Sequence, residues 1–208
     1  MKTTLRWLKY LGMAILLLFI TAMIALGVRN YLILRQVHQF DQEVAQAAEK
    51  HDISEYQDLV SAIIFTESKG KDVDIMQSSE SVYGDPGKIT DTKESIEHGV
   101  SFLAQALKKA KEQGCDLWTA VQAYNFGLDY IDFIADNGGH NTLKLAEEYS
   151  RDVLSPMLGN TDQNQYRYWG IRSLFYNGGR LYHNGGNLFY AEIVKFNQLK
   201  IRGTSFLF

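Results

Sequence analysis

The chain has 208 residues, of which 46% are hydrophobic, 22% are charged and only one is a cysteine. This length predicts one domain of ordinary size with an appendage, large enough to bury a core without disulfide bonds. All 24 acidic residues lie from Asp41 onward, but five of the 21 basic residues precede it, which leaves residues 41–208 with 16 basic residues and a formal charge of −8. Such an acidic domain lacks the basic surface that nucleic acids require, so we expect no nucleic-acid partner.

The N-terminal region contains an uncharged apolar run of nineteen residues, Tyr10 to Val28. At 1.5 Å per residue, a helix of this length crosses a hydrocarbon core of about 30 Å, which predicts a membrane anchor. Three basic residues precede the run and two follow it. We therefore expect a single-pass cell-membrane protein with residues 1–9 in the cytoplasm and the rest outside. A cleaved signal peptide, cut near Ala25-Leu26-Gly27, is the alternative, but the run is longer than a signal core.

The next predicted elements are a stalk and the first helix of the domain. Residues 29–53 show helical spacing of apolar residues, at Val37, Phe40, Val44 and Ala47 or Ala48, which predicts a helical stalk. A domain is expected over residues 54–200, followed by a short tail at 201–208. Ser54 and Gln57 have the spacing of a capping box, so a helix should begin there. Its apolar stripe consists of Tyr56, Val60, Ile63 and Ile64, and ends with Glu67.

The later part of the chain also has mostly helical patterns. Asp91, with Glu94 three residues on, predicts a helix that ends at Gly114, and Asp116 predicts a shorter one that stops at Gly127. Further helices are expected at 129–136, 141–157, 163–175 and 187–200. Asn-Gly-Gly, a turn signal, occurs at 137–139, 177–179 and 184–186. Residues 175–186 should therefore form a small β-hairpin or an irregular loop in a fold that is mainly α.

The stripe of the first domain helix ends with the carboxyl group of Glu67. Apolar neighbours remove part of its water, and the last turn of a helix presents partial negative charge, so both effects raise the pKa of Glu67. A carboxylic acid that keeps its proton near neutral pH suits general-acid cleavage of a glycosidic bond. Position alone leaves a second interpretation open, because glutamates are common in solvated last turns.

Three motifs follow one another in the predicted domain: Glu67-Ser68, then the segment DIMQSSES at 74–81, then AYNFG at 123–127. In this order the sequence resembles the lysozyme-like superfamily of soluble lytic transglycosylases and goose-type lysozymes. In that superfamily an E-S pair ends a helix, a G-L-M-Q-type segment follows, and A-Y-N-x-G comes later. DIMQSSES is closer to the cell-wall lysozymes of Gram-positive bacteria, including those on conjugative elements, and so are TLKLAEEYS at 142–150 and the closing GGNLFYAEIV. Asp74 replaces the superfamily's glycine, as in that subgroup.

The resemblance covers about residues 54–194 and implies a lysozyme-like helical fold that binds peptidoglycan glycan strands without a cofactor or metal. It implies cleavage of the MurNAc–GlcNAc β-1,4 bond, with Glu67 as the acid and base and Tyr190 in contact with its carboxyl group. The other substrate-binding residues that it implies are Ser68, Gln77, Ser78, Tyr124 and Asn125. Structural roles compete for several of these residues, since Ser68 and Asn125 also suit helix ends and both tyrosines suit a core.

The number of catalytic carboxyl groups decides between muramidase and lytic transglycosylase. Retaining glycosidases place two carboxyl groups about 5–5.5 Å apart, and inverting ones about 6.5–9.5 Å apart. The resemblance to transglycosylases implies that one suffices, because the muramic C6 hydroxyl group attacks. Glu80 is the first candidate for a second carboxylate, with Asp72, Asp74 and Asp85 as others, and the sequence leaves the two outcomes open.

A different class of function also fits the same residues: a catalytically inactive, membrane-tethered module that binds the wall or acts as a scaffold. Other classes fit poorly. The five histidines form no H-x-x-x-H or H-x-x-E pair, which argues against zinc. Cys115 has no second cysteine and is expected to be a small buried hydrophobe rather than a nucleophile. The sequence has neither a P-loop nor G-x-G-x-x-G, so no nucleotide site is expected.

Overall fold

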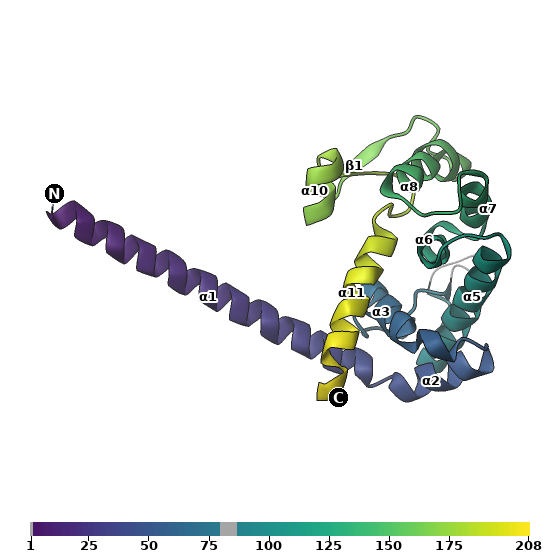
Figure 1. Cartoon of the computed structure of the whole chain (residues 1–208), viewed down its shortest axis with the longest axis horizontal. Helices are drawn as coiled ribbons and strands as arrows, with labels where there is room; N and C mark the ends of the chain where they lie inside the picture. Colours follow the sequence, from purple (N-terminus) through teal and green to yellow (C-terminus); the bar gives the residue numbers. More distant parts are fainter. Residues whose placement is uncertain (1, 80–86) are drawn as a thin grey trace.

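Helices make up most of the structure, and one small antiparallel sheet accompanies them (Figure 1), which confirms the predicted fold class. The computed structural model describes residues 2–79 and 87–208. The longer helices are α1 (Lys2–His38), α2 (Asp41–Lys50), α3 (Gln57–Glu67), α5 (Thr92–Glu112), α6 (Leu117–Phe126), α7 (Asp129–Asp136), α8 (Leu143–Tyr149), α10 (Ile171–Asn177) and α11 (Tyr190–Thr204). Shorter turns are η1 (Ser54–Tyr56), η2 (Ser150–Leu154), α9 (Ser155–Met157) and η3 (Ser205–Leu207). The strands are β1 (Gln165–Arg167) and β2 (Arg180–Tyr182).

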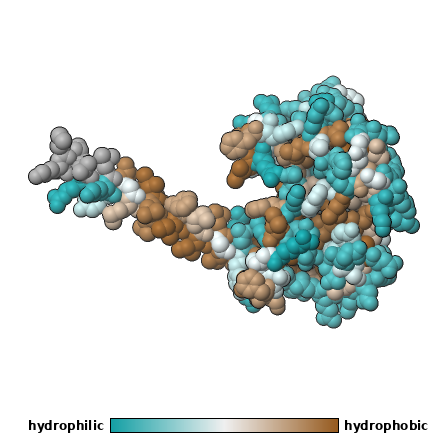
Figure 2. All heavy atoms as spheres, in the orientation of Figure 1, coloured by the Kyte–Doolittle hydropathy of each residue, from teal (hydrophilic) through white to brown (hydrophobic). Residues whose placement is uncertain are grey.

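α1 is one unbroken helix that joins the predicted anchor to the core of the domain. Residues 9–28 are exposed, and the most apolar 18-residue window of the helix has a mean hydropathy of 2.6. Figure 2 shows this stretch as a mostly brown rod that projects from the domain. Farther along, Ile33 and Val37 are buried, and the C-terminal Phe208 stacks on His38 with ring centroids 4.6 Å apart. In the described part of the chain, α1 is the one helix long and apolar enough to cross a membrane.

The segment that was predicted to be a stalk, residues 29–53, is instead packed into the domain from Ile33 onward. After a turn at residues 39–40 the chain continues into α2, whose Val44, Ala47 and Ala48 are buried in the same hydrophobic core as the end of α1. The helical spacing was correctly recognised, but an apolar stripe has the same period whether it faces a second chain or a core. The sequence pattern therefore could not distinguish a stalk from a core helix.

α3 is the central helix of the first core and ends at the site described below. Leu59, Val60, Ile63 and Ile64 are all fully buried, so α3 is covered on several sides, and it packs against α1, α2 and α11. A helix that is apolar around most of its circumference belongs in the interior. This placement buries the end of α3, where Glu67 lies, between α11 and the loop that follows α3.

The helix starts that were predicted from capping residues have different outcomes. Asp91 and Asp116 cap α5 and α6 as expected, since their side chains accept hydrogen bonds from the backbone N–H groups of Lys93 at 3.3 Å and Thr119 at 2.8 Å. The capping box predicted at Ser54 is wrong. The chain instead enters α3 through the 3-10 turn η1, and no side chain caps either element.

The helix predicted at 141–157 is present as three consecutive helical segments, α8, η2 and α9. The middle segment is a π-helical turn, Ser150–Leu154. Pro156 explains the change of pitch, because proline has no N–H group and its ring collides with the carbonyl group four residues earlier. The Ser150 hydroxyl group fixes the turn by donating to the Gly185 carbonyl group at 2.7 Å.

The predicted helix at 163–175 is wrong in its first half. Residues 165–167 form β1, which pairs with β2 in an antiparallel register of Gln165 with Tyr182 and Arg167 with Arg180. The helix α10 begins only after Gly170, in the loop between the two strands. Strands of three residues are too short to show the alternation that identifies a strand. A small hairpin was one of the two alternatives predicted for residues 175–186, and the sheet is present, but its first strand lies outside that range.

Candidate active site

Glu67, the last residue of α3, is held by a tyrosine that lies 123 residues later in the sequence. The hydroxyl group of Tyr190, the first residue of α11, donates to Glu67 Oε1 at 2.5 Å. Burial raises the pKa of Glu67 most strongly, the bond from Tyr190 lowers it in part, and the negative charge of Asp74 raises it again. The helix dipole of α3 acts in the same direction as burial. The surroundings of Glu67 thus favour its protonated, neutral form.

Two parallel tyrosines form the wall beside Glu67. The rings of Tyr124 and Tyr190 stack with centroids 6.2 Å apart and an interplanar angle of 6°. The Tyr124 hydroxyl group donates to the Met76 carbonyl group at 2.9 Å, and Phe102 meets the Tyr124 ring edge-on. Burial raises the pKa of both tyrosines well above the usual value, with a smaller contribution from the charge of Glu67. Both hydroxyl groups therefore remain protonated donors.

The loop after α3 is organised around the buried carboxylate of Asp74. Its Oδ1 accepts hydrogen bonds from the Ser95 hydroxyl group at 2.6 Å and the Ser78 N–H group at 2.9 Å, and its Oδ2 accepts from the Ser79 N–H group at 3.0 Å. Burial by itself raises the pKa of Asp74, but the bonds from Ser95, Ser79 and the two backbone amides outweigh it and lower the pKa. The surroundings of Asp74 thus favour its ionised form, whereas those of Glu67 favour the neutral form.

These groups open into a cleft with a volume of about 810 Å³. Polar and apolar side chains share its lining, which suits a sugar with hydroxyl groups on its edges and C–H groups on its faces. The residues that line it are Glu67, Asp74, Gln77, Ser79, Phe102, Tyr124, Asn125, Phe126, Gly127, Leu154, Leu158, Asn184 and Gly186. They come from α3, its following loop, α5, α6, the α8–α9 region and the turn before α11.

Asn125 joins two sides of the cleft. Its Oδ1 accepts a hydrogen bond from the backbone N–H group of Asn187 at 2.7 Å, which ties the end of α6 to the third Asn-Gly-Gly turn. Gly186 allows this close approach, because a Cβ atom there would lie 2.8 Å from Asn125 Oδ1 and 2.8 Å from the ring of Phe126. Its φ of +61° is also unfavourable for other residues.

We expect Gly186→Ala to lower the free energy of unfolding by about 2–4 kcal/mol, because backbone strain adds to the collision. Denaturant titration would measure the loss. Gly114→Ala is the matched control, since Gly114 has a φ of +70° with no atom within 4 Å of the added Cβ, and it should cost only about 1–2 kcal/mol. Equal losses in the two variants would show that the contact with Asn125 does not constrain residue 186.

The structure brings most of the predicted site residues together. Glu67, Gln77, Tyr124 and Asn125 line the cleft, and Tyr190 lies behind Glu67 with its hydroxyl group on the carboxyl group. Gln77 is exposed at the rim with a φ of +51°, and its Nε2 donates to the Asp74 carbonyl group at 2.9 Å.

Two predicted binding residues, Ser68 and Ser78, are buried supports rather than parts of the lining. The Ser68 hydroxyl group donates to the Ile75 carbonyl group at 2.8 Å and accepts from the Gly70 N–H group at 3.1 Å. The Ser78 hydroxyl group donates to the Ser95 carbonyl group at 3.1 Å. Their hydroxyl groups hold the loop in shape, so we assign them a structural role.

The structure also distinguishes among the candidates for a second carboxylate. Glu80, the first choice, and Asp85 lie outside the described residues. Asp72 is exposed and is not among the lining residues. Asp74 therefore is the described carboxylate that accompanies Glu67 in the cleft.

For several residues that line the cleft, nothing in the sequence indicates that they belong to a site. Leu154 and Leu158 are spaced as neighbours on one helix face, but nothing local shows that this face meets α6. Phe102 likewise looks like an ordinary residue of α5. Their roles arise only when helices far apart in the sequence come together, whereas Ser79 was within a recognised motif and could have been included.

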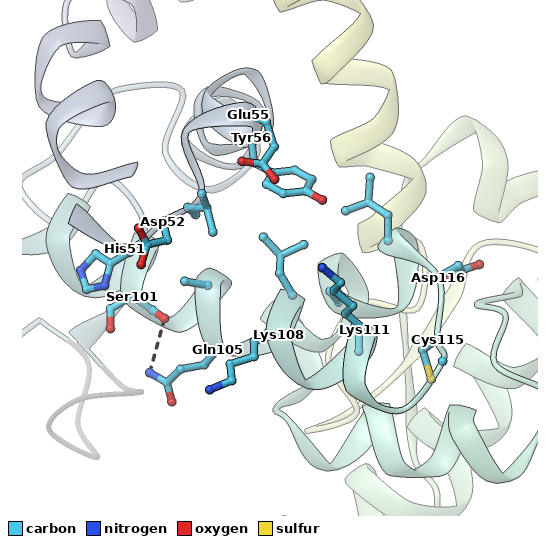
Figure 3. Close-up of a pocket in the computed structure, with 17 residues that line it drawn as sticks. His51, Asp52, Glu55, Tyr56, Ser101, Gln105, Lys108, Lys111, Cys115 and Asp116 are labelled. Atoms are coloured by element: carbon cyan, nitrogen blue, oxygen red, sulfur yellow. Dashed lines mark hydrogen bonds between the residues drawn. The ribbon is translucent and has the colours of Figure 1, made fainter. Parts of the chain in front are cut away.

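A second cavity of about 740 Å³ lies elsewhere and shares no lining residue with the cleft (Figure 3). Its walls come from the turn between α2 and α3, from α5 and from the start of α6, with Glu55, Lys108 and Lys111 among the charged side chains around it. Cys115, at its edge, directs its thiol group toward the Ile131 carbonyl group at 3.7 Å, and burial raises its pKa. A thiol held in this way is a poor nucleophile.

The described residues contain no group of three or more His, Cys, Asp or Glu side chains that could hold a metal ion. Some histidines contact single carboxylates instead, such as His38 with Asp41 at 2.8 Å and His140 with Asp116 at 3.5 Å. What the cleft offers chemically is a carboxyl group with a raised pKa, a nearby carboxylate and hydrogen-bonding tyrosines.

Residues 34–198 match the protein family described as Lysozyme-like. A pneumococcal vaccine antigen A homologue of Streptococcus pyogenes serotype M1 is 49% identical over 154 residues, which cover 74% of this chain and 77% of that protein. The bifunctional muramidase/DL-endopeptidase CwlT of Bacillus subtilis (strain 168) is 38% identical over 116 residues, which cover 56% of this chain and 34% of CwlT.

A comparison with a solved structure agrees with the family match. A Staphylococcus aureus protein described as similar to a lipoprotein of the NLP/P60 family superposes with a TM-score of 0.72 and 29% identity, over 79% of this chain and 52% of that chain. The matched range of 34–198 begins in the buried last turns of α1 and includes every residue that lines the cleft. The chain belongs to the lysozyme-like family.

Proposed function

We propose that this chain cleaves the β-1,4 bond between MurNAc and GlcNAc in peptidoglycan, with Glu67 as the catalytic acid and base. The observation that carries the proposal is the half-buried Glu67 carboxyl group in a cleft of about 810 Å³, with the Tyr190 hydroxyl group 2.5 Å from it. Membership of the lysozyme-like family and similarity to a protein named as a muramidase support this class of substrate.

In the first step, the proton of the neutral Glu67 carboxyl group moves to the glycosidic oxygen. The bond between the MurNAc anomeric carbon and that oxygen breaks, its electron pair stays with the GlcNAc oxygen, and positive charge develops on the MurNAc ring. Burial, which raises the pKa of Glu67, keeps the proton available for this transfer near neutral pH. The ionised Asp74, which lines the same cleft, is suited to stabilise the positive charge.

In the second step, Glu67 is a carboxylate and accepts a proton from the attacking hydroxyl group. Water as the attacking group gives a reducing MurNAc end, and the C6 hydroxyl group of the same MurNAc gives a 1,6-anhydro end. Asp74 is poorly suited to act as a covalent nucleophile, because both of its oxygens accept hydrogen bonds from Ser78, Ser79 and Ser95. The proposal therefore relies on one acid and base, in either outcome.

The cleft lining divides into groups that hold the sugar and groups that position the acid. We assign glycan contact to Gln77, at the rim, and to Asn125, whose Oδ1 is already bonded to Asn187 and whose amide group remains to donate to a sugar. Tyr190 positions the Glu67 carboxyl group through its hydroxyl group, and Tyr124 supports Tyr190 by stacking on its ring.

We further propose that α1 spans the cell membrane with residues 1–9 in the cytoplasm and the domain facing the wall. The helix is long and apolar enough to cross, and the basic residues that precede its apolar run favour this direction. A substrate in the cell wall requires the same topology. Protease protection of intact cells would test it, because external protease should digest the domain while residues 1–9 stay protected.

We expect Tyr190→Phe to lower turnover about tenfold and to move the high-pH limb of the rate profile upward. The hydroxyl group of Tyr190 stabilises the Glu67 carboxylate, so its removal raises the pKa of Glu67 and extends the pH range of the protonated acid. The pH dependence of cell-wall clearing measures both effects. An unchanged pH limb would show that Tyr190 does not set the pKa of the catalytic group.

The direct test of activity is the clearing of purified peptidoglycan by the detergent-solubilised full chain. Loss of turbidity that depends on Glu67 supports the proposal. A chain that binds the wall material without clearing it would be a tethered binding module instead.

A further inference from the structure

The distance between the membrane span and the domain core is very short. Val28 ends the apolar run and Ile33, five residues later in the same helix, is already buried in the core. Five residues of helix rise about 7.5 Å. The headgroup layer on each side of a bilayer is about 5–7 Å thick. If α1 spans the bilayer, the side of the domain from which α1 emerges must therefore lie against the headgroups.

Figure 1 shows which elements form that side. α11 runs across the end of α1, and α10 projects from the domain on the same side as the free part of α1. Phe208, shortly after α11, stacks on Tyr31 of α1 with ring centroids 5.7 Å apart. Burial, and then the charge of Arg29 in α1, lower the pKa of Lys200 in α11. The exposed side chains of Phe196 and Leu199 lie on the same stretch of α11. Cations and apolar groups thus surround the point at which α1 emerges.

The segment from β1 to β2, residues 165–182, forms an arm whose outer surface is unusually apolar. Trp169, Ile171 and Phe175 are 81%, 82% and 86% exposed, and Leu174 is 51% exposed. Single exposed apolar residues are normal in soluble domains, but a cluster of this kind marks an interaction site. Figure 2 shows brown and tan side chains gathered at the corresponding corner of the domain, on the side toward α1.

The charges of the arm have one sign. It contains Arg167, Arg172 and Arg180 and no acidic residue, although residues 41–208 as a whole carry a formal charge of −8. The Arg167 guanidinium group lies 4.9 Å from the centre of the Trp169 ring, and Arg172 pairs with Glu192 of α11. Exposed tryptophan and phenylalanine beside arginine are the composition of surfaces that enter the boundary between headgroups and acyl chains.

From these observations we infer that the arm docks on the anionic surface of the same bilayer that α1 enters, with Trp169, Ile171 and Phe175 inserted below the headgroups. The inference goes beyond the proposed chemistry and rests only on α1 as the membrane span. Glycan is a poorer occupant, because no residue of 165–182 lines the cleft and a neutral saccharide gives Arg167 and Arg180 no anionic partner.

Docking of the arm would also fix the position of the cleft. Tyr168 of the arm stacks on Phe189 with centroids 6.2 Å apart, and its hydroxyl group accepts a hydrogen bond from Asn187 at 3.3 Å. The backbone of Asn187 in turn donates to Asn125 in the cleft. Two attachments, α1 and the arm, would hold the cleft at one height and one angle above the bilayer.

The test uses the full chain in vesicles of phosphatidylglycerol and phosphatidylcholine whose acyl chains carry bromine, a short-range quencher of tryptophan. The variant W7F/W118F leaves Trp169 as the single fluorophore, and W7F/W169F leaves Trp118, which packs against the first core, as the matched control. We expect the emission of Trp169 to be quenched by at least half in brominated relative to unbrominated vesicles, and that of Trp118 to change by less than a tenth. Substitution of Arg167 and Arg180 by glutamine in W7F/W118F should weaken the quenching.

Three results would overturn the inference. Quenching of Trp169 no greater than that of Trp118, in a chain that floats with the vesicles, would show that the arm stays in water. A chain that fails to float would remove the anchor on which the inference rests. A shift of Trp169 emission on addition of soluble glycan fragments, without quenching by brominated lipid, would make the arm a sugar-binding surface. None of these results depends on whether Glu67 is catalytic, so docking and turnover can fail separately.

Discussion

Glu67→Gln should reduce peptidoglycan cleavage by about 10²–10⁴-fold, the usual contribution of a positioned general acid. Glutamine has nearly the same shape and can accept the hydrogen bond from Tyr190, but it has no proton to give to the glycosidic oxygen. The initial rate of turbidity loss from purified peptidoglycan measures the effect. The variant is followed for several hours so that its low rate can be detected.

The same substitution should leave the fold intact or slightly more stable. Burial raises the pKa of Glu67, so the folded protein binds a proton that the unfolded chain releases as pH rises above the ordinary value of 4.5. The stability contributed by this group is therefore present below that value and is lost as pH rises through the pKa of the folded state. Above the pKa of the folded state, the folded protein must bury an ionised carboxylate, which costs stability. Glutamine carries no charge and avoids this cost, so the melting temperature at neutral pH should be equal to or above that of the parent.

Glu55→Gln is the matched control for catalysis. Glu55 is an exposed glutamate that lines the second cavity, and its substitution should leave clearing unchanged if the cleft beside Glu67 is the site of reaction. Full activity in Glu67→Gln together with loss in Glu55→Gln would move the active site to the second cavity.

Asp74→Ala should lower the free energy of unfolding by about 2–4 kcal/mol. The carboxylate accepts hydrogen bonds from Ser78, Ser79 and Ser95, and alanine would leave these buried donors without their acceptor. Activity should also fall, because the loop that carries Gln77 would lose its shape. Denaturant titration at pH 7 measures the stability, with the exposed Asp162→Ala as a control expected to stay within about 0.5 kcal/mol.

The contribution of Asp74 to stability changes with pH in the opposite direction to the contribution of Glu67. The net effect of the hydrogen bonds is to lower the pKa of Asp74, so its contribution is present above the ordinary value of 3.8 and disappears as pH falls through the lower pKa of the folded state. The difference between Asp74→Ala and its parent should shrink in acid. A difference that stayed constant down to pH 2 would show that the carboxylate form is not what stabilises the loop.

The parts of the fold that the sequence predicted correctly depend on local chemistry. Asp91 and Asp116 cap helices within three residues of themselves, and the helix at 129–136 follows from short-range periodicity. The errors arose where tertiary context decides. The stripe of Val44 and Ala48 could not show that α2 packs against α3 and α5, and three-residue strands such as β1 carry too little alternation to be recognised.

The candidate site was predictable to a different degree for each residue. The position of Glu67 on an apolar stripe at a helix end predicted a raised pKa on physical grounds alone, and the structure gives burial as the main cause. Tyr190 lies 123 residues away, so its contact with Glu67 was expected only from the resemblance to a family. The role of Asp74 in organising its loop depends on Ser95, which lies in α5, and no local pattern contains that information.

The most direct measurement for the proposed function is mass spectrometry of the soluble fragments that the full chain releases from purified peptidoglycan. The proposal predicts disaccharide-based muropeptides that end in MurNAc, either reducing or 1,6-anhydro, and no such fragments from Glu67→Gln. Fragments that end in reducing GlcNAc, peptides freed from intact glycan strands, or identical products from Glu67→Gln would contradict it.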